Sequence, residues 1–550
     1  MLSYRKLAMR VLGRPLHTEG SDSPRPASQR AAALILTAAM LTTLTAPAFA
    51  KEWYIEEGDI TVRAGETEGT NKVSQGENPE VEDTNTVITN SDKDKASSNT
   101  VTIEAKDKDD KVEVTLKDVN IDASSRSEAA VSVTGEGNTN IELDGDNALK
   151  SDIYSSGISS SGSLTISGGE NDSLTAQGGS GADGIYSSGS LTISGGTVTA
   201  NGGSCADGGD GGDGIWSSGG VTISGGSTVT ANGGDGKDDY GGDGIRSSDV
   251  TISGGSTVTA NGGNGGNVSG DGIRSDGGVT ISGGTVKAAG GDSKDGYGGD
   301  GIRSGGVTIS GGTVNAAGGN GGKVGGYGIC SFARVAISGG TVNAAGGNGK
   351  NSNGGSDGII SNDIDLSGSL ELTAKAGRPN GKAISWAGHE LDLDTIKDKL
   401  GPGAKVTATD ANGETKQVSS PIPRPVEPEE PEPVIPEESS SSSDGGSATP
   451  SAPASPLPGL TVTDKDGQHI SYTSIRGNNV LSIRVGRFTA SLRASLATLR
   501  QLRAEGIDTI TFQTILCSTT LSVDELLAMG GEDAEAVLTH RLTDSSLTVG

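Results

Sequence analysis

Residues 214–231 read GIWSSGGVTISGGSTVTA, and this stretch contains the pattern that decides the fold. It holds three short phrases rich in Ile, Val and Thr, separated by glycine and serine. In the middle phrase Val221 and Ile223 flank a threonine, which is the period-two alternation of a strand with one buried face. The glycines Gly225 and Gly226 lie between the second and third phrases, where a sharp turn needs backbone angles that glycine adopts easily. The stretch therefore predicts three short strands joined by tight turns.

The same three phrases return along the chain at a nearly constant period. The spacing between successive isoleucines of the Gly-Ile-x-Ser phrase ranges from 27 to 30 residues. One such unit buries about four aliphatic side chains worth roughly 1.5 to 3 kcal/mol each, against about 1 to 2 kcal/mol for every backbone residue that is ordered. A single unit is therefore unstable, whereas stacked units cover each other's faces. The repeated isoleucines are Ile158, Ile185, Ile215, Ile245, Ile273, Ile302, Ile329 and Ile359.

Stacking of these units predicts an all-β fold, a right-handed parallel β-helix with three short strands per coil and about ten coils. A collagen helix is excluded because glycine does not recur at every third position with proline. A helical solenoid is excluded because glycine and β-branched residues dominate where helix formers are needed. Disorder is the remaining alternative for a chain with 91 glycines and 31% hydrophobic residues. The phased Val and Ile residues favour the stacked core, because disorder does not require them.

Composition divides the chain into five segments. Basic residues, an apolar run at 31–44 and the small residues around Ala50 form the pattern of an export signal that is cleaved before Lys51. The expected segments are a signal peptide at 1–50, an N-terminal cap with irregular first coils at 51–130, parallel β-helix repeats at 131–420, a Pro/Glu/Ser-rich linker at 421–459 and a small α+β domain at 460–550.

The last segment has the periodicity of an ordinary globular domain. We expect strands at 479–485 and 509–514, because aliphatic residues alternate there. The leucine spacing at 490–504, followed by Gly506, predicts a helix. A second short helix is expected at 523–529, because Ser522 and Glu525 have the spacing of a capping box.

Charge and composition exclude several classes of function. The chain has 42 Lys and Arg against 70 Asp and Glu, a net charge of -28, which repels nucleic acid. Its three cysteines lie in different segments and its four histidines are scattered, so a disulfide framework, a zinc site and histidine catalysis are not expected. The apolar run at 31–44 is short for a membrane span, so no transmembrane segment is expected after removal of the signal. We therefore expect a secreted or extracellular protein, with attachment to the cell surface left open.

Three stretches resemble a known type of protein. They are WYIEEGDITV at 53–62, IELDGDNALK at 141–150 and the repeated Gly-Gly-Val-Thr-Ile-Ser-Gly-Gly-Thr-Val. Over residues 53 to about 410 the chain resembles the secreted β-helix proteins of gut bacteria that are described as carbohydrate-binding domain-containing. The resemblance implies the β-helix fold and sugar binding, without defining a ligand or a set of site residues.

The position after each repeated isoleucine is expected to face outward and to align with its equivalents in neighbouring coils. Aromatic rings and guanidinium groups in such a row can stack on sugar rings. Tyr186, Trp216 and Arg246 are the predicted centre of a glycan-binding face, which Arg274 and Arg303 extend. The alternative is that this outward position tolerates any residue.

A second row consists of aspartates that precede Gly-Ile in most units. Stacked carboxylates repel each other unless they are screened or bridged by cations. Residues 208–216 also fit a Ca²⁺-binding nonapeptide, although the match does not repeat every nine residues as true arrays do. Asp210, Asp213 and Asp243 are therefore candidate Ca²⁺ ligands, and the alternative is that each aspartate caps a turn. No other cofactor is expected.

Catalysis is not expected, because near-identical coils offer no specialised cluster of acid and base groups. The function that the sequence favours is a non-catalytic, adhesin-like protein of the cell surface or exterior that binds glycans or surface polysaccharide. The alternatives are a structural stalk or spacer without a ligand and, less favoured, a polysaccharide-degrading enzyme.

Overall fold

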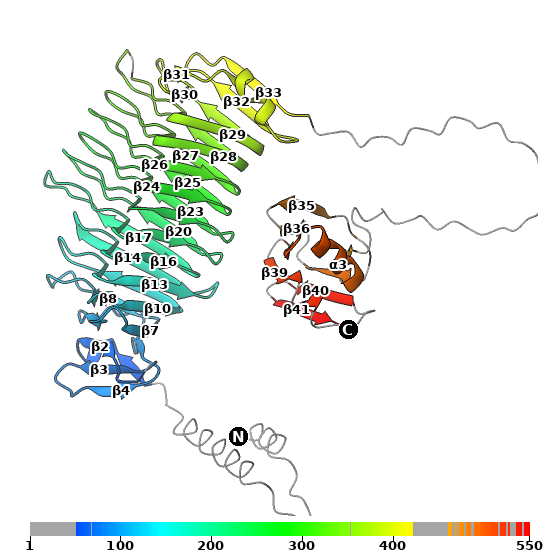
Figure 1. Cartoon of the computed structure of the whole chain (residues 1–550). Coiled ribbons are helices and arrows are strands. Elements are labelled where there is room, and N and C mark those ends of the chain that lie inside the picture. Colours follow the sequence, from blue (N-terminus) through cyan, green and yellow to red (C-terminus); the bar gives the residue numbers. More distant parts are fainter. Residues whose placement is uncertain are drawn as a thin grey trace, which may run out of the picture. The chain divides into compact units, whose positions relative to one another are not determined.

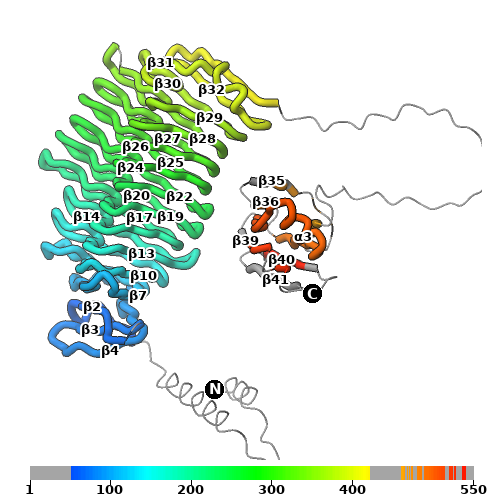
Figure 2. Tube along the Cα trace, in the orientation of Figure 1, coloured from blue at the N-terminus to red at the C-terminus, as the bar shows by residue number. Residues whose placement is uncertain are grey.

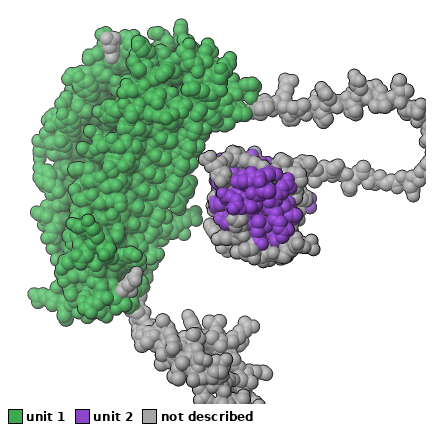
Figure 3. All heavy atoms as spheres, viewed as in Figure 1, with its two compact units in different colours: residues 1–427 green, residues 428–550 purple. Residues whose placement is uncertain are grey.

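The computed structural model describes residues 51–421, except 68 and 353, and residues 460–549 with several short gaps. The chain divides into two compact units at residue 427, which are coloured separately in Figure 3. The expected signal peptide at 1–50 lies outside the described residues, as does the expected linker beyond residue 421. The first unit is a parallel β-helix and the second is a small α+β unit.

The first unit consists of stacked coils that each contribute three strands. Its 33 strands, β1 to β33, belong to one hydrogen-bonded sheet that winds around a central core. Successive coils lie directly on one another along the unit (Figures 1 and 2). The strand that contains the repeated isoleucine, here called a rung, pairs in parallel with its equivalent in the next coil. This pairing is continuous from Ile158 to Ile384. The all-β right-handed parallel β-helix predicted from the sequence is confirmed.

The strands form three faces, and long strands pass from one face to the next. The first face contains β2 (Ile60–Ala64), β6 (Val101–Glu104), β9 (Val131–Thr134), β12 (Ile158–Ser160), β15 (Ile185–Ser187), β18 (Ile215–Ser217), β21 (Ile245–Ser247), β24 (Ile273–Ile281), β26 (Ile302–Ile309), β28 (Ile329–Ala345), β29 (Ile359–Lys375) and β30 (Ile384–Trp386). These are twelve rungs where the sequence predicts about ten, because residues 60–131 also form regular parallel strands.

The second and third faces follow the other two phrases of the repeat. The second contains β1 (Glu52–Tyr54), β5 (Val87–Thr89), β7 (Lys111–Lys117), β10 (Asn138–Asp144), β13 (Ser163–Gly168), β16 (Leu191–Ile193), β19 (Val221–Ile223), β22 (Val250–Ile252) and the later halves of β24 and β26. The third contains β8 (Asn120–Asp122), β11 (Asp146–Lys150), β14 (Ser173–Ser180), β17 (Thr197–Gly203), β20 (Thr228–Asn232), β23 (Thr257–Asn261), β25 (Thr285–Ala289), β27 (Thr313–Ala317) and β32 (Lys405–Thr409). Both β28 and β29 run through all three faces.

The core is a column of aliphatic side chains that repeats in every coil. In one coil Ile245, Val250, Ile252 and Val258 are all fully buried, and their equivalents in the next coil stack on them. Alternation along each strand leaves threonines such as Thr251 outside. Because each coil covers its neighbours, burial of a few aliphatic residues per coil stabilises the whole column.

The serine of the Gly-Ile-x-Ser phrase points into the corner between the first and second faces. Ser217 Oγ lies 2.9 Å from the carbonyl oxygen of Gly189 and 3.0 Å from that of Gly220. Ser304 Oγ donates to the carbonyl oxygen of Gly306 at 2.7 Å. The buried hydroxyls of Ser217 and Ser304 therefore have hydrogen-bond partners at the corner.

Glycine is required at the turn between the second and third phrases and in the stacked loops. Gly225 and Gly226 have φ of +67° and +74°, as the sequence predicts. In the loops, a Cβ atom on Gly242 would lie 1.9 Å from the carbonyl oxygen of Gly212 in the preceding coil. The close approach of successive loop backbones therefore excludes side chains at this position.

Both ends of the column are closed by antiparallel strands and short helices. At the N-terminal end η1 (Ile55–Glu57) precedes β2, which pairs with β3 (Asn71–Gln75), and β3 pairs with β4 (Val81–Asp83). Trp53 Nε1 donates to Asp83 Oδ2 at 2.7 Å within this cap. At the C-terminal end β31 (His389–Glu390), η2 (Leu393–Lys399) and β33 (Thr415–Ser419) cover the last coil.

The second unit contains two four-stranded sheets and the helix α3 (Leu496–Ala504). The expected strands at 479–485 and 509–514 correspond to β36 (Val480–Arg484) and β38 (Thr509–Gln513). The expected helix at 490–504 is wrong over its first six residues, because Thr489–Ser495 forms strand β37 between two partners. The remaining strands are β34 (Leu460–Thr463), β35 (Thr473–Gly477), β39 (Ser518–Ser522), β40 (Glu535–Arg541) and β41 (Asp544–Val549). Val523, Leu526 and Leu527 are helical, within the expected second helix.

Candidate functional site

The predicted outward row lies in register along the first face. Tyr186 pairs with Trp216, Trp216 with Arg246, and Arg246 with Arg274. Arg274 then pairs with Arg303, so all five side chains project from consecutive rungs about 4.8 Å apart. All five side chains are half-buried.

The aromatic end of this row is a contact cluster. The rings of Tyr186 and Trp216 meet edge to face, with centroids 5.2 Å apart and planes at 79°. On the other side Arg246 Cζ lies 5.2 Å from the centroid of the Trp216 ring. This geometry offers a planar guanidinium and ring edges to a ligand, and both groups contact sugars in proteins. Trp216 is therefore the central residue of the cluster.

The aspartates that precede Gly-Ile form a hydrogen-bonded ladder beside the arginine row. Each carboxylate accepts the backbone N–H of its equivalent in the next coil, as Asp213 does from Asp243 at 2.6 Å. Tyr327 takes the place of an aspartate in one coil, and its N–H donates to Asp300 Oδ1 at 2.6 Å. The ladder from Asp213 to Asp300 is buried. The other bonds are from Asp213 to Asp183, from Asp271 to Asp243, from Asp300 to Asp271 and from Lys382 to Asp357.

Burial makes these carboxylates hard to ionise. Loss of hydration raises the pKa of Asp183 and of Asp300 to about 6. Burial, and then the neighbouring aspartates, raise the pKa of Asp213 and Asp271 well above the ordinary value. Arginines of the outward row oppose this shift. The arginine row therefore compensates a buried acidic ladder, a structural role that the sequence did not reveal.

One rung shows this compensation directly. Arg303 Nη1 lies 3.7 Å from Asp300 Oδ2, and that oxygen has no hydrogen-bond partner within the part of the chain that the structure describes. The next position of the row is Cys330, whose burial raises the pKa of its thiol to about 12. The row therefore changes along its length, from aromatic contacts at Trp216 to charge compensation at Arg303.

The three candidate Ca²⁺ ligands occupy different environments. Asp213 and Asp243 belong to the buried ladder, where one oxygen of each already accepts a backbone N–H. Asp210 lies in an exposed loop and accepts the N–H of Tyr240 at 3.2 Å. Among the described residues, no three His, Cys, Asp or Glu side chains converge as a metal site. The structure thus brings Asp213 and Asp243 together and leaves Asp210 apart.

A row of exposed aromatic residues was not anticipated from the sequence. Tyr240 and Tyr297 are 47% and 46% exposed, and isolated bridges connect them through Val268. The bridges continue from Tyr297 to Val324. The signal was present, because each tyrosine stands three residues before an aspartate of the buried ladder. The register is also constant against the strand phrases, because each residue of this row stands five residues before a repeated isoleucine.

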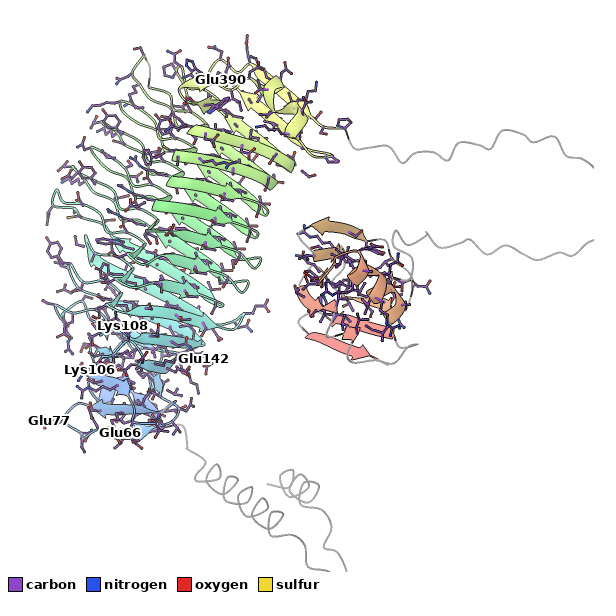
Figure 4. The ribbon with its side chains drawn as sticks, viewed as in Figure 1. Glu66, Glu77, Lys106, Lys108, Glu142 and Glu390 are labelled. Carbon is purple, nitrogen blue, oxygen red and sulfur yellow. The ribbon has the colours of Figure 1, made fainter. Side chains whose placement is uncertain are left out.

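A surface hollow of about 770 Å³ lies at the N-terminal coils. Its lining includes Glu52, Tyr54, Lys117 and Glu142, the last of which is labelled in Figure 4. Glu52 accepts hydrogen bonds from Tyr54 Oη at 2.9 Å and from Lys117 Nζ at 3.2 Å. The bond to Tyr54 and then the lysine lower the pKa of Glu52. This carboxylate is therefore held as an anion within the wall.

Comparison with known families supports the repeat. A family model described as "Beta helix repeat" matches residues 191–215, 221–245, 279–302 and 307–329. These segments are similar to a beta helix repeat. The matched segments contain the ladder aspartates Asp213, Asp243 and Asp300. They end one residue before Trp216, Arg246 and Arg303 of the outward row. No curated protein and no solved structure matches the chain.

The β-helix repeat fold occurs in enzymes as well as in proteins without catalytic activity, and it is compatible with binding, adhesion and a stalk-like role. Within residues 51–421 and the described parts of 460–549, none of the helices has the length and apolar character needed to cross a membrane.

Proposed function

We propose that this protein is a secreted or cell-surface protein that binds carbohydrate on the outside of its β-helix and does not catalyse a reaction. The observation that carries the proposal is the distribution of aromatic residues. Of the ten aromatic residues between 51 and 421, only Trp53 is buried. The core is filled with Ile, Val, Leu and Ala instead. Contact between an aromatic ring and water is unfavourable, so exposed rings favour the binding of ligands with apolar ring faces.

The cluster of Tyr186, Trp216 and Arg246 is the proposed binding centre. A pyranose ring has an apolar C–H face and a rim of hydroxyl groups. The aromatic rings contact such a face, while the guanidinium of Arg246 donates hydrogen bonds to hydroxyl oxygens. Arg274 and Arg303 continue the row of donors along the first face. Arg303 also lies beside the ladder, with its Nη1 3.7 Å from Asp300 Oδ2, which reduces the ordering cost of binding at this residue.

Export supports the same proposal. The basic and apolar pattern of residues 1–50 is typical of a signal peptide, and the net charge of -28 suits an exterior rich in cations. The resemblance to gut-bacterial carbohydrate-binding domain-containing proteins points to glycans or surface polysaccharide as partners. For the described residues we assign no catalytic group, since Glu52 in the N-terminal hollow is already engaged by Tyr54 and Lys117.

A glycan array probed with the mature protein tests the proposal, followed by calorimetric titration of the best ligand. We expect Trp216→Ala to weaken binding by about 10-fold or more, because it removes the central ring of the cluster. Thr222→Ala is the matched control, since this exposed threonine lies in the same coil on the second face. Binding that is equally strong in both variants contradicts the proposed centre. A protein that binds no glycan at all favours the stalk, which the regular stacking of near-identical coils also suits.

A further inference from the structure

We propose that Tyr240, Val268, Tyr297 and Val324, the tyrosine stripe, bind an extended β-1,4-linked glycan that runs parallel to the axis of the β-helix. This inference rests on the proposed function, and it adds a second site with a defined linkage and direction. The stripe lies in the glycine-rich loops, whereas the Trp216 cluster lies on the first face. The two sites therefore share no residue.

The stripe is held rigidly although it lies in loops. Three bridges connect its four residues in order, from Tyr240 through Val268 and Tyr297 to Val324. The backbone N–H of Gly241 donates to the carbonyl oxygen of Val268 at 3.0 Å, and that of Ser269 to the oxygen of Tyr297 at 3.0 Å. These bonds fix the Cα positions of both tyrosines relative to the helix axis. A rigid pair of rings selects ligands by spacing, because little reorganisation accompanies binding.

The spacing of the two tyrosines is the feature that points to the ligand. They are two rungs apart, which corresponds to about 9.5 Å along the axis. In an extended β-1,4-linked chain each sugar is rotated by roughly half a turn from the one before. The same ring face therefore recurs at every second sugar, over a length close to two rungs. Tyr240 and Tyr297 can each contact an equivalent sugar face, with the smaller Val268 beneath the sugar between them.

The surroundings of the stripe are polar, as a sugar ligand requires. Lys237, Asp238, Lys294 and Asp295 are exposed in the same loops. Lys323 Nζ lies 5.6 Å from the centroid of the Tyr297 ring. These groups can donate to or accept from sugar hydroxyls on either side of the stacked rings. An aromatic pair separated by valine and flanked by charges differs from the contiguous apolar surface of a typical protein interface.

Titration of the full mature chain with linear oligosaccharides tests the inference. The probes are β-1,4-linked cello- and chito-oligosaccharides of increasing length, with α-1,4-linked malto-oligosaccharides as a geometric control. We expect affinity to rise once the β-linked chain reaches about three sugars, because only then can both tyrosines be contacted. The curved α-linked chains should show no such rise.

Substitutions then assign the binding to the stripe. Tyr240→Ala and Tyr297→Ala should each weaken binding of the longer β-linked chains by about 2- to 10-fold. Tyr240→Phe and Tyr297→Phe keep the rings and should bind as the unaltered chain does. Both tyrosines are exposed, so far-ultraviolet circular dichroism should confirm that all variants fold. Alanine variants that bind with unchanged affinity, or affinity without length dependence, overturn the inference.

The outcome also separates the two proposals. If Trp216→Ala abolishes glycan binding while the tyrosine variants bind normally, the proposed function stands and the tyrosine stripe is not a site. If the unaltered protein binds neither the array nor the oligosaccharides, the proposed function itself fails.

Discussion

Replacing Asp300 by Asn should stabilise the β-helix at neutral pH and have little effect in acid. The side chain of Asp300 is buried, and burial raises its pKa from 3.8 to about 6. Because this pKa is higher in the folded than in the unfolded state, the protonated side chain contributes fully to the free energy of unfolding below about pH 4. This contribution to stability is lost as the pH rises through about 6. At about 1.4 kcal/mol per pKa unit, the rise of the pKa lowers the free energy of unfolding at neutral pH by roughly 3 kcal/mol.

Asparagine keeps what the neutral side chain provides. Its Oδ1 can still accept the N–H of Tyr327, the bond that Asp300 makes at 2.6 Å. The variant loses the interaction with Arg303, at 3.7 Å, but it also removes a negative charge that raises the pKa of Asp271. We therefore expect a gain of up to about 3 kcal/mol at neutral pH and almost none below pH 4.

Urea unfolding followed by circular dichroism at about pH 4 and about pH 7.5 measures this difference. Asp249→Asn is the matched control, because Asp249 also accepts a backbone N–H from the next coil, that of Gly278, but is exposed. The control should shift the unfolding midpoint by the same small amount at both pH values. If Asp300→Asn destabilises the protein at neutral pH, the carboxylate is a favourable partner of Arg303, and the reasoning about its burial is wrong.

Two further predictions concern the loops. Gly242→Ala should prevent regular stacking of the coils, because its Cβ would lie 1.9 Å from a backbone oxygen of Gly212. Loss of the β-sheet signal in circular dichroism, or of soluble protein, checks this prediction. Gly283→Ala is the control and should fold normally, because a Cβ at that position has no neighbour within 4 Å. Millimolar Ca²⁺ should leave the thermal midpoint unchanged, because binding at Asp213 and Asp243 would displace the backbone N–H groups that their carboxylates accept. A saturable rise of the midpoint with Ca²⁺, absent in Asp210→Asn, would instead establish the calcium site.

The strand register of the β-helix could be read from the sequence because hydrogen bonding aligns strands and ignores loop length. The isoleucines of the first face pair as their spacing implies, from Ile158 to Ile359. The outward row from Tyr186 to Arg303 follows from the same register, since neighbouring positions in a strand point to opposite sides. The contacts that the side chains of this row make could not be predicted from the register. The burial of the aspartates depends on the packing of neighbouring coils, which the strand register alone does not specify.

The second unit shows where local preference misled the prediction. Residues 490–504 contain alanines, leucines and arginines, which favour a helix in isolation. In the structure Ala490, Leu492 and Ala494 alternate on the buried side of β37, which pairs with β34 and with β40. Pairing on both sides outweighs a propensity difference of a few tenths of a kcal/mol per residue. The helix begins only at Leu496, where Ser495 Oγ accepts the N–H of Thr498.

The identical register of successive coils makes each coil an interchangeable module. Ile245, Val250 and Val258 present to the next coil the same surface that Ile273, Val279 and Val286 present to the one after. Removing or duplicating one full period would therefore create no new type of interface, while it would change the length of the column by about 4.8 Å. The number of repeats therefore sets the length of the column in steps of one coil. The distance between ligand contacts on the outside of the column changes in the same steps.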